Sequence, residues 1–177
     1  MASEIIVNTI KAPTTGANAN KVIIPTGVTL DIADNLAYDS MPSGTVIQQV
    51  SNHTPSMFST SGTTYVSTNA SVTITPRYAN SKMVIWICGS AHFDGASDHG
   101  RGQIRKNGAA FSNFNNDDLL AYIGRTEARG DMVGMSYVDD NVGTTSSVTY
   151  AYYIKSSSSR TTYFYRNTGI IVQEIKV

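Results

Sequence analysis

The feature that most constrains the fold is a succession of short β-strand patterns, separated by turn residues, from residue 45 to the C-terminus. In the longest alternating pattern, Val148, Tyr150, Tyr152 and Ile154 share one face. Asn107-Gly108 is a typical hairpin turn, because both residues tolerate a positive φ. The expected strands are 45–50, 71–75, 83–88, 102–106, 132–138, 148–154, 161–165 and 170–177. Short strands at this spacing predict an all-β fold, an antiparallel β-sandwich of the jelly-roll kind.

Two segments need separate interpretations. Residues 83–88 are apolar on both faces, which is typical of a central strand, and we expect Cys88 to be a small buried hydrophobe there. Residues 117–123 begin with two aspartates and favour a helical turn. The remainder of the chain gives little indication of helix.

The first forty residues differ from the rest and predict a separate N-terminal stem or arm, residues 1–40, before the sandwich domain of residues 41–177. They contain short β-branched clusters between turn-rich pieces, and no aromatic residue precedes Tyr38. With so little apolar mass, we expect this segment to gain order only against sister copies or another protein. The expected subunit-interface residues are apolar or aromatic: Ile5, Val7, Ile23, Leu30, Tyr150, Tyr152 and Tyr163. For the tyrosines, the alternative is the core and rim of a single domain.

Charge and composition exclude several classes of function. The chain has 13 basic and 13 acidic residues without a basic run, so it lacks the positive patch that nucleic-acid binding requires. No apolar stretch approaches the length that spans a bilayer, and no secretory signal precedes the first strand pattern. We therefore expect a protein that is made in a cytoplasm and contacts neither nucleic acid nor the membrane interior.

One loop, residues 92–99, concentrates side chains that can bind metal ions. His92, Asp94, Asp98 and His99 lie within eight residues, but the paired histidines of a metal enzyme's strand are absent. We interpret the loop as an ordinary surface loop and expect no metal, no cofactor and no catalytic residue. The sequence also lacks a nucleophile elbow and a phosphate-binding loop.

Several motifs resemble the C-terminal domains of bacteriophage tail-fibre and virion appendage proteins. They are Ser3–Ile10, Met41–Gln48, Ser71–Pro76 continuing through Asn80-Ser81-Lys82 into Met83–Ile85, Gly102–Gly108 and Val172–Ile175. The resemblance spans most of the chain, although each motif is a loose β-strand pattern. It implies a homotrimeric jelly-roll head, similar to tumour-necrosis-factor-like trimers, on an intertwined N-terminal stem.

These observations predict a non-enzymatic structural protein of a virion, assembled in the host cytoplasm. As a tail fibre, it would anchor to the tail through its N-terminal arm and meet a host glycan or protein through its loops. The expected receptor contacts are His92, Asp94, Asp98, His99, Phe111, Asn113 and Phe114. As a capsid decoration protein, it would lie on the major capsid protein through the same arm. A metal-dependent jelly-roll enzyme is the more distant alternative.

Overall fold

The computed structural model describes residues 41–94, 99–111, 121–123, 131–158 and 160–177, together with residues 14–16 and 26. The chain divides into two units, Met1–Ser40 and Met41–Val177, and the described fold belongs to the second. Apart from residues 14–16 and 26, the predicted stem, including Ile5, Val7, Ile23 and Leu30, lies outside the described residues.

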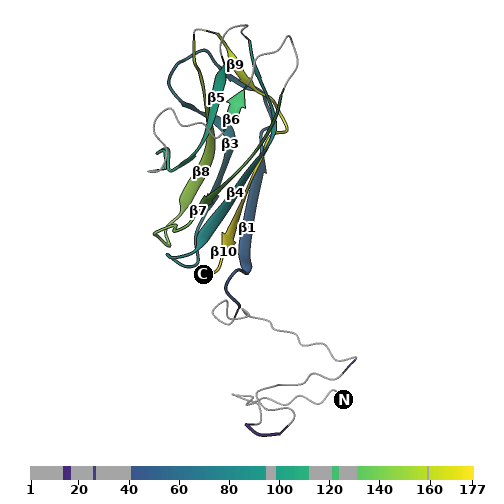
Figure 1. The fold of residues 1–177 in the computed structure, drawn as a ribbon, viewed down its shortest axis with the longest axis vertical. Coiled ribbons are helices and arrows are strands. Elements are labelled where there is room, and N and C mark those ends of the chain that lie inside the picture. The colour runs from purple at the N-terminus through teal and green to yellow at the C-terminus, as the bar shows by residue number, and fades with distance from the viewer. Residues whose placement is uncertain are drawn as a thin grey trace, which may run out of the picture. The chain divides into compact units, whose positions relative to one another are not determined.

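The described residues form an all-β fold with ten strands and no helix (Figure 1). The strands are β1 (Val46–His53), β2 (Phe58–Thr60), β3 (Val66–Ile74), β4 (Lys82–Phe93), β5 (Gly100–Lys106), β6 (Ala121–Ile123), β7 (Asp131–Asp139), β8 (Val148–Ser156), β9 (Thr162–Phe164) and β10 (Gly169–Ile175). Each of the eight segments expected from the sequence overlaps one of these strands. None of the described residues forms a helix long and apolar enough to cross a membrane.

The strands form two antiparallel sheets. In sheet A, β1 pairs with β10, β10 with β4, and β4 with β7 along its other edge. The short strands β2 and β9 pair with each other, and β9 also pairs with the last residues of β4. Sheet B has the order β3-β8-β5-β6. This order, with neighbouring strands drawn from distant parts of the chain, is compatible with a jelly roll.

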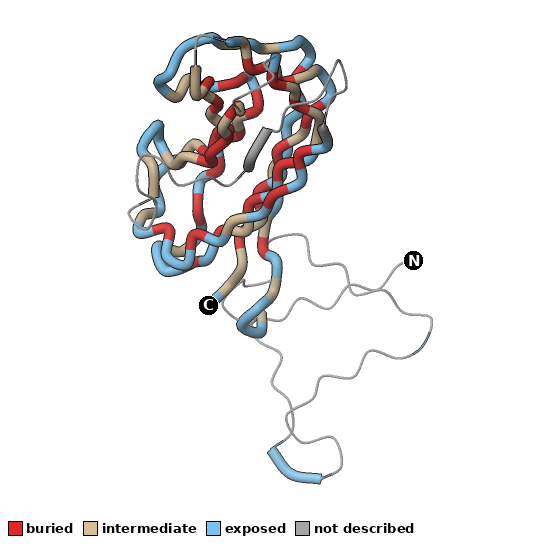
Figure 2. The backbone as a smooth tube through the Cα atoms, turned by 45° about the horizontal axis from the view of Figure 1, so that its top comes forward, coloured by how far each residue is buried: buried red, intermediate tan, exposed pale blue. Residues whose placement is uncertain are grey.

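The two sheets enclose one hydrophobic core, whose residues are among the buried positions drawn in red in Figure 2. Val148, Tyr150, Tyr152 and Ile154 of β8 share one face, as the sequence pattern predicted, and all four are fully buried in the core. Burial raises the pKa of the Tyr150 and Tyr152 hydroxyls far above their ordinary value, and for Tyr150 the hydrogen bond to Asp139 adds to the effect. Both hydroxyls therefore stay neutral in the folded protein.

The structure corrects two expectations. Residues 121–123, predicted to close a helical turn, form strand β6 and pair with the start of β5, because pairing satisfies their backbone groups in the sheet. Cys88, predicted to be buried, is an exposed free thiol on β4. The strand is central, since β10 and β7 flank it, but only one of its faces enters the core.

The end of the sandwich that carries the linker from residue 40 is held by several hydrogen bonds. We call this end the linker end. Gly44 N–H donates to the Lys176 carbonyl (2.8 Å), Lys176 N–H donates to Thr45 (2.9 Å), and the Lys176 ammonium donates to Met41 (2.6 Å). The C-terminal strand thus fixes the residues at which the domain begins.

A buried carboxylate organises the same end. Glu174 has no exposed surface and accepts from the N–H groups of Arg77 (2.9 Å) and Tyr78 (3.2 Å) and from the hydroxyl of Ser81 (2.6 Å). The side-chain amide of Gln48 donates to it as well. One side chain of β10 therefore holds β1 and the loop between β3 and β4 together, and its acceptor positions are filled by polar donors.

A second buried network lies nearby. Asp139, at the end of β7, accepts from the Tyr150 hydroxyl (2.6 Å) and the Lys106 ammonium (2.7 Å). Lys106 also donates to the Val142 carbonyl (2.7 Å). These contacts join β5, β7 and β8, so Asp139 has a structural role.

Candidate functional site

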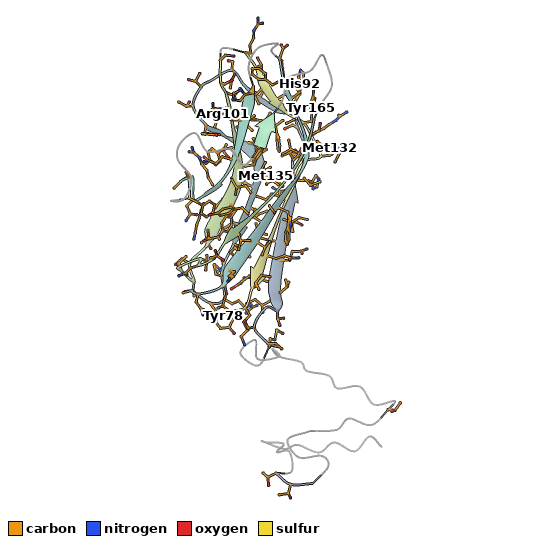
Figure 3. The ribbon with its side chains drawn as sticks, viewed as in Figure 1. Tyr78, His92, Arg101, Met132, Met135 and Tyr165 are labelled. Atoms are coloured by element: carbon orange, nitrogen blue, oxygen red, sulfur yellow. The ribbon has the colours of Figure 1, made fainter. Side chains whose placement is uncertain are left out.

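The opposite end of the sandwich, which we call the far end, is formed where β4 leads into β5 and β8 leads into β9. Figure 3 places His92 and Arg101 toward this end and Tyr78 at the linker end. His92 lies on the outer face of β4, beside Tyr163 of β9 in the sheet register, and the two rings stack with centroids 5.9 Å apart. Asp94 follows directly and is exposed; its N–H donates to the Thr161 carbonyl (2.9 Å).

His99 and Arg101 form the second half of the far end, at the start of β5. Arg101 Nε donates to His99 Nε2 (3.0 Å), so this imidazole nitrogen acts as an acceptor. The backbone of His99 is fixed by Ser157, whose N–H donates to the His99 carbonyl (3.1 Å) and whose hydroxyl accepts from the His99 N–H (3.1 Å). The far end therefore presents imidazole, guanidinium and phenol groups on a fixed backbone.

The Ser157 hydroxyl donates to the main-chain carbonyl of His99, and Arg101 donates to the imidazole Nε2. Within the described residues, no three histidine, cysteine, aspartate or glutamate side chains converge as metal ligands would.

The structure distributes the predicted receptor contacts unevenly. His92, Asp94 and His99 lie at the far end, whereas Asp98, Asn113 and Phe114 lie outside the described residues. Phe111 packs on Tyr137 (centroids 4.3 Å apart) and lies 6.5 Å from the Tyr150 ring, at the margin of the core. Its contacts favour a packing role, and the receptor contact at this residue stays a prediction.

The predicted interface tyrosines also separate into two groups. Tyr150 and Tyr152 have no exposed surface within a single chain, so they belong to the domain's own core and cannot reach a neighbouring subunit. The two tyrosines do share one face of β8, but that face is turned toward the core. Tyr163 is half-buried on the outer face of sheet A and stays a candidate.

The outer face of sheet A carries a surface that the sequence interpretation missed. In the sheet register, Trp86 of β4 lies beside Ile171 of β10, and Val84 lies beside Val138 of β7. Trp86 and Ile171 are each 37% exposed, Val138 is 42% exposed, and Met132 at the start of β7 is 83% exposed. We call these five residues the apolar face. Its signal was present in the two-sided apolar pattern of residues 83–88, which was interpreted as complete burial.

Comparison with known proteins adds no further constraint: neither protein-family models nor curated protein sequences match the chain.

Proposed function

We propose that this chain is a structural, non-enzymatic protein of a bacteriophage particle, displayed on the outside of the virion as a homotrimeric appendage of the tail-fibre type. The observation that carries the proposal is the difference between the ends of the domain. The linker end fixes Met41, Gly44 and Thr45 to the last strand, while the far end presents His92 and Arg101. A domain held at one end and displaying polar and aromatic side chains at the other suits an appendage that meets a surface.

The strand order supports the jelly-roll head that the sequence resemblance implies. If β2 is counted as a continuation of β1, and β9 as a continuation of β10, sheet A has four strand positions in the order β1, β10, β4, β7. Sheet B adds four more, in the order β3, β8, β5, β6. Eight strand positions in two sheets, with the first strand (β1) beside the last strand (β10), are the arrangement of two Greek keys.

The apolar face supports self-association. Exposed apolar side chains that include a tryptophan are typical of an interaction site. Sister copies are the occupant that we propose, because the same chain has a second region, residues 1–40, whose apolar clusters also require cover. Assembly of identical subunits would satisfy both regions at once, with Tyr163 at the margin.

Sedimentation of the full-length chain tests this assembly. We expect a species of about 57 kDa, three times the 19.0 kDa of one chain. Trp86→Glu places a charge in the apolar face and should weaken the trimer by about 30-fold, because a central interface tryptophan is worth ~2 kcal/mol or more. Thr73→Glu, on the exposed surface of β3, is the matched control and should leave the trimer intact. A monomer at micromolar concentration, or equal trimer strength in all three proteins, contradicts the proposal.

Labelling of virions with an antibody against the chain tests the location. Signal at the tail supports the appendage role. Signal distributed over the capsid surface instead selects the decoration role, in which the N-terminal arm would lie on the major capsid protein. Absence of the chain from the particle would refute both roles.

A further inference from the structure

The outer face of sheet B carries a group of aromatic and basic side chains around Arg105. Gln103 and Arg105 alternate with Ile104, which is buried in the core, so both side chains lie on the outer face of β5. Tyr153 of β8 lies beside Gln103 in the sheet register, and Lys155 lies two residues further along β8. Tyr65 precedes β3. We call these five residues the tyrosine–arginine cluster.

Arg105 is held in one orientation by four neighbours. The centre of its guanidinium lies 4.9 Å from the Tyr65 ring centroid and 5.0 Å from that of Tyr153, within cation–π range of both. Its Nε donates to Gln103 Oε1 (2.9 Å), and Nη1 donates to the Gly108 carbonyl (3.3 Å). A guanidinium has five N–H donors, so several are left for a ligand.

No acidic side chain neutralises Arg105 in the part of the chain that the structure describes. The described carboxylates of Glu174 and Asp139 are buried in the two networks of the linker end, and Asp140 pairs with Lys82 at 3.3 Å. A half-buried cation without a counter-ion is costly, and an anion that binds it recovers that cost.

Gln103 is a second residue of the cluster with a donor group that lacks a hydrogen-bond acceptor among the described residues. Its side chain has no exposed surface, although it lies on an outward position of the strand. Because Arg105 can only donate, Gln103 must turn its oxygen toward the guanidinium, which directs its Nε2 elsewhere. That Nε2 is buried and has no acceptor among the described residues. The cluster therefore contains a surplus of hydrogen-bond donors.

The neighbouring groups narrow the class of ligand. The Lys155 ammonium lies 4.8 Å from the Tyr65 ring centroid, so a second positive charge accompanies the same aromatic ring. Guanidinium pairs with carboxylate or sulfate through two parallel hydrogen bonds, and tyrosine offers an apolar ring with a polar tip. Charge, donors and aromatic rings on one sheet face suit a sugar that carries an acidic group.

We propose that the tyrosine–arginine cluster binds an acidic saccharide, with the carboxylate or sulfate of one sugar unit accepting hydrogen bonds from the guanidinium of Arg105. This inference names the ligand class for the host contact and, in that sense, rests on the proposed function. It extends the host contact from the far end to the outer face of sheet B.

Calorimetric titration of the full-length protein with a hexamer of glucuronic acid tests the site, with a neutral glucose hexamer of equal length as the comparison. We expect binding of the acidic hexamer alone. Arg105→Gln should weaken it at least tenfold, and Arg105→Lys should weaken it by a smaller factor, because lysine keeps the charge but loses the paired geometry. Arg166→Gln removes one exposed cation from the turn between β9 and β10 and should leave binding unchanged.

Three results would overturn the site: equal binding of the neutral hexamer, an equal loss in Arg166→Gln, or no loss in Arg105→Gln. Equal binding of a hexaglutamate peptide would overturn the saccharide as the ligand. Sedimentation of Arg105→Gln separates the two proposals. We expect a normal trimer that has lost saccharide binding, whereas failure of the trimer in the unmodified protein would count against the proposed function and not against this site.

Discussion

The two ends of the sandwich satisfy their polar groups in opposite ways. At the linker end, the carboxylates of Glu174 and Asp139 are buried and accept hydrogen bonds from several strands and loops. At the far end, the polar side chains of His92 and Arg101 lie at the surface, and the core below them is aromatic. There the Tyr152 ring packs on Phe164 (centroids 4.9 Å apart), and the Tyr152 hydroxyl is buried without a partner in the described structure.

This difference shows where the domain derives its rigidity. Buried, fully satisfied polar networks specify a unique arrangement, and removal of one member leaves the others without partners. Surface polar groups can be changed at little cost in stability, which is what a binding surface requires. Stability and display therefore belong to different ends of one core, and the two ends should respond differently to substitution.

The largest effect is expected at Glu174. Replacement by Ala leaves the N–H groups of Arg77 and Tyr78 and the Ser81 hydroxyl without their acceptor, and should lower the free energy of unfolding by about 3–4 kcal/mol. Urea unfolding at one protein concentration, followed by circular dichroism, measures the change.

The matched control for Glu174→Ala is Asp140→Ala. The Asp140 side chain is 78% exposed and pairs with Lys82 in the part of the chain that the structure describes, so its loss should cost less than about 0.5 kcal/mol. Equal stability of Glu174→Ala and the unmodified protein would show that the linker end does not depend on the buried carboxylate.

A smaller effect is expected at Gly102, which lies on the core side of β5 toward the far end. A Cβ at this position would lie 1.7 Å from the Tyr152 hydroxyl oxygen, and the ring cannot retreat because it is fully buried against Phe164. Gly102→Ala should therefore lower stability by about 2–3 kcal/mol through overpacking.

Gly134 provides the control for this substitution. It lies on β7, and a Cβ added there would meet no atom within 4 Å, so Gly134→Ala should be neutral or slightly stabilising. A similar loss in both variants would mean that the effect belongs to glycine in a strand and not to the packing of Tyr152.

Much of the fold could be predicted from the sequence because it depends on local patterns. Alternation predicted that Val148, Tyr150, Tyr152 and Ile154 share one face of β8, and Asn107-Gly108 forms the expected turn with φ values of 50° and 81°. Glu174 shares a face with the buried Val172, but no buried role was predicted for it. Its partners could not be predicted, because Arg77 and Tyr78 lie 97 and 96 residues away in the chain.

The surfaces were harder to predict than the core. An apolar pattern on both faces of residues 83–88 cannot distinguish a face covered by the same chain from one left open, and Trp86 and Cys88 are in fact exposed. The tyrosine–arginine cluster was missed for a different reason. Its members lie at residues 65, 103–105 and 153–155, and only the pairing of β5 with β8 and the start of β3 brings them together.

The smallest effect gives the sharpest comparison, because Tyr150 and Tyr152 lie two residues apart on the same strand and face the same core. Tyr150→Phe removes the hydrogen bond to Asp139 and should cost about 1–2 kcal/mol. Tyr152→Phe removes a buried hydroxyl that has no partner in the described structure, and should raise stability by about 0.5–1 kcal/mol. Opposite signs in urea unfolding would locate the satisfied polar network at the linker end. An equal loss in both variants would mean that the Tyr152 hydroxyl has a bound partner such as water, and that the two ends are held in the same way.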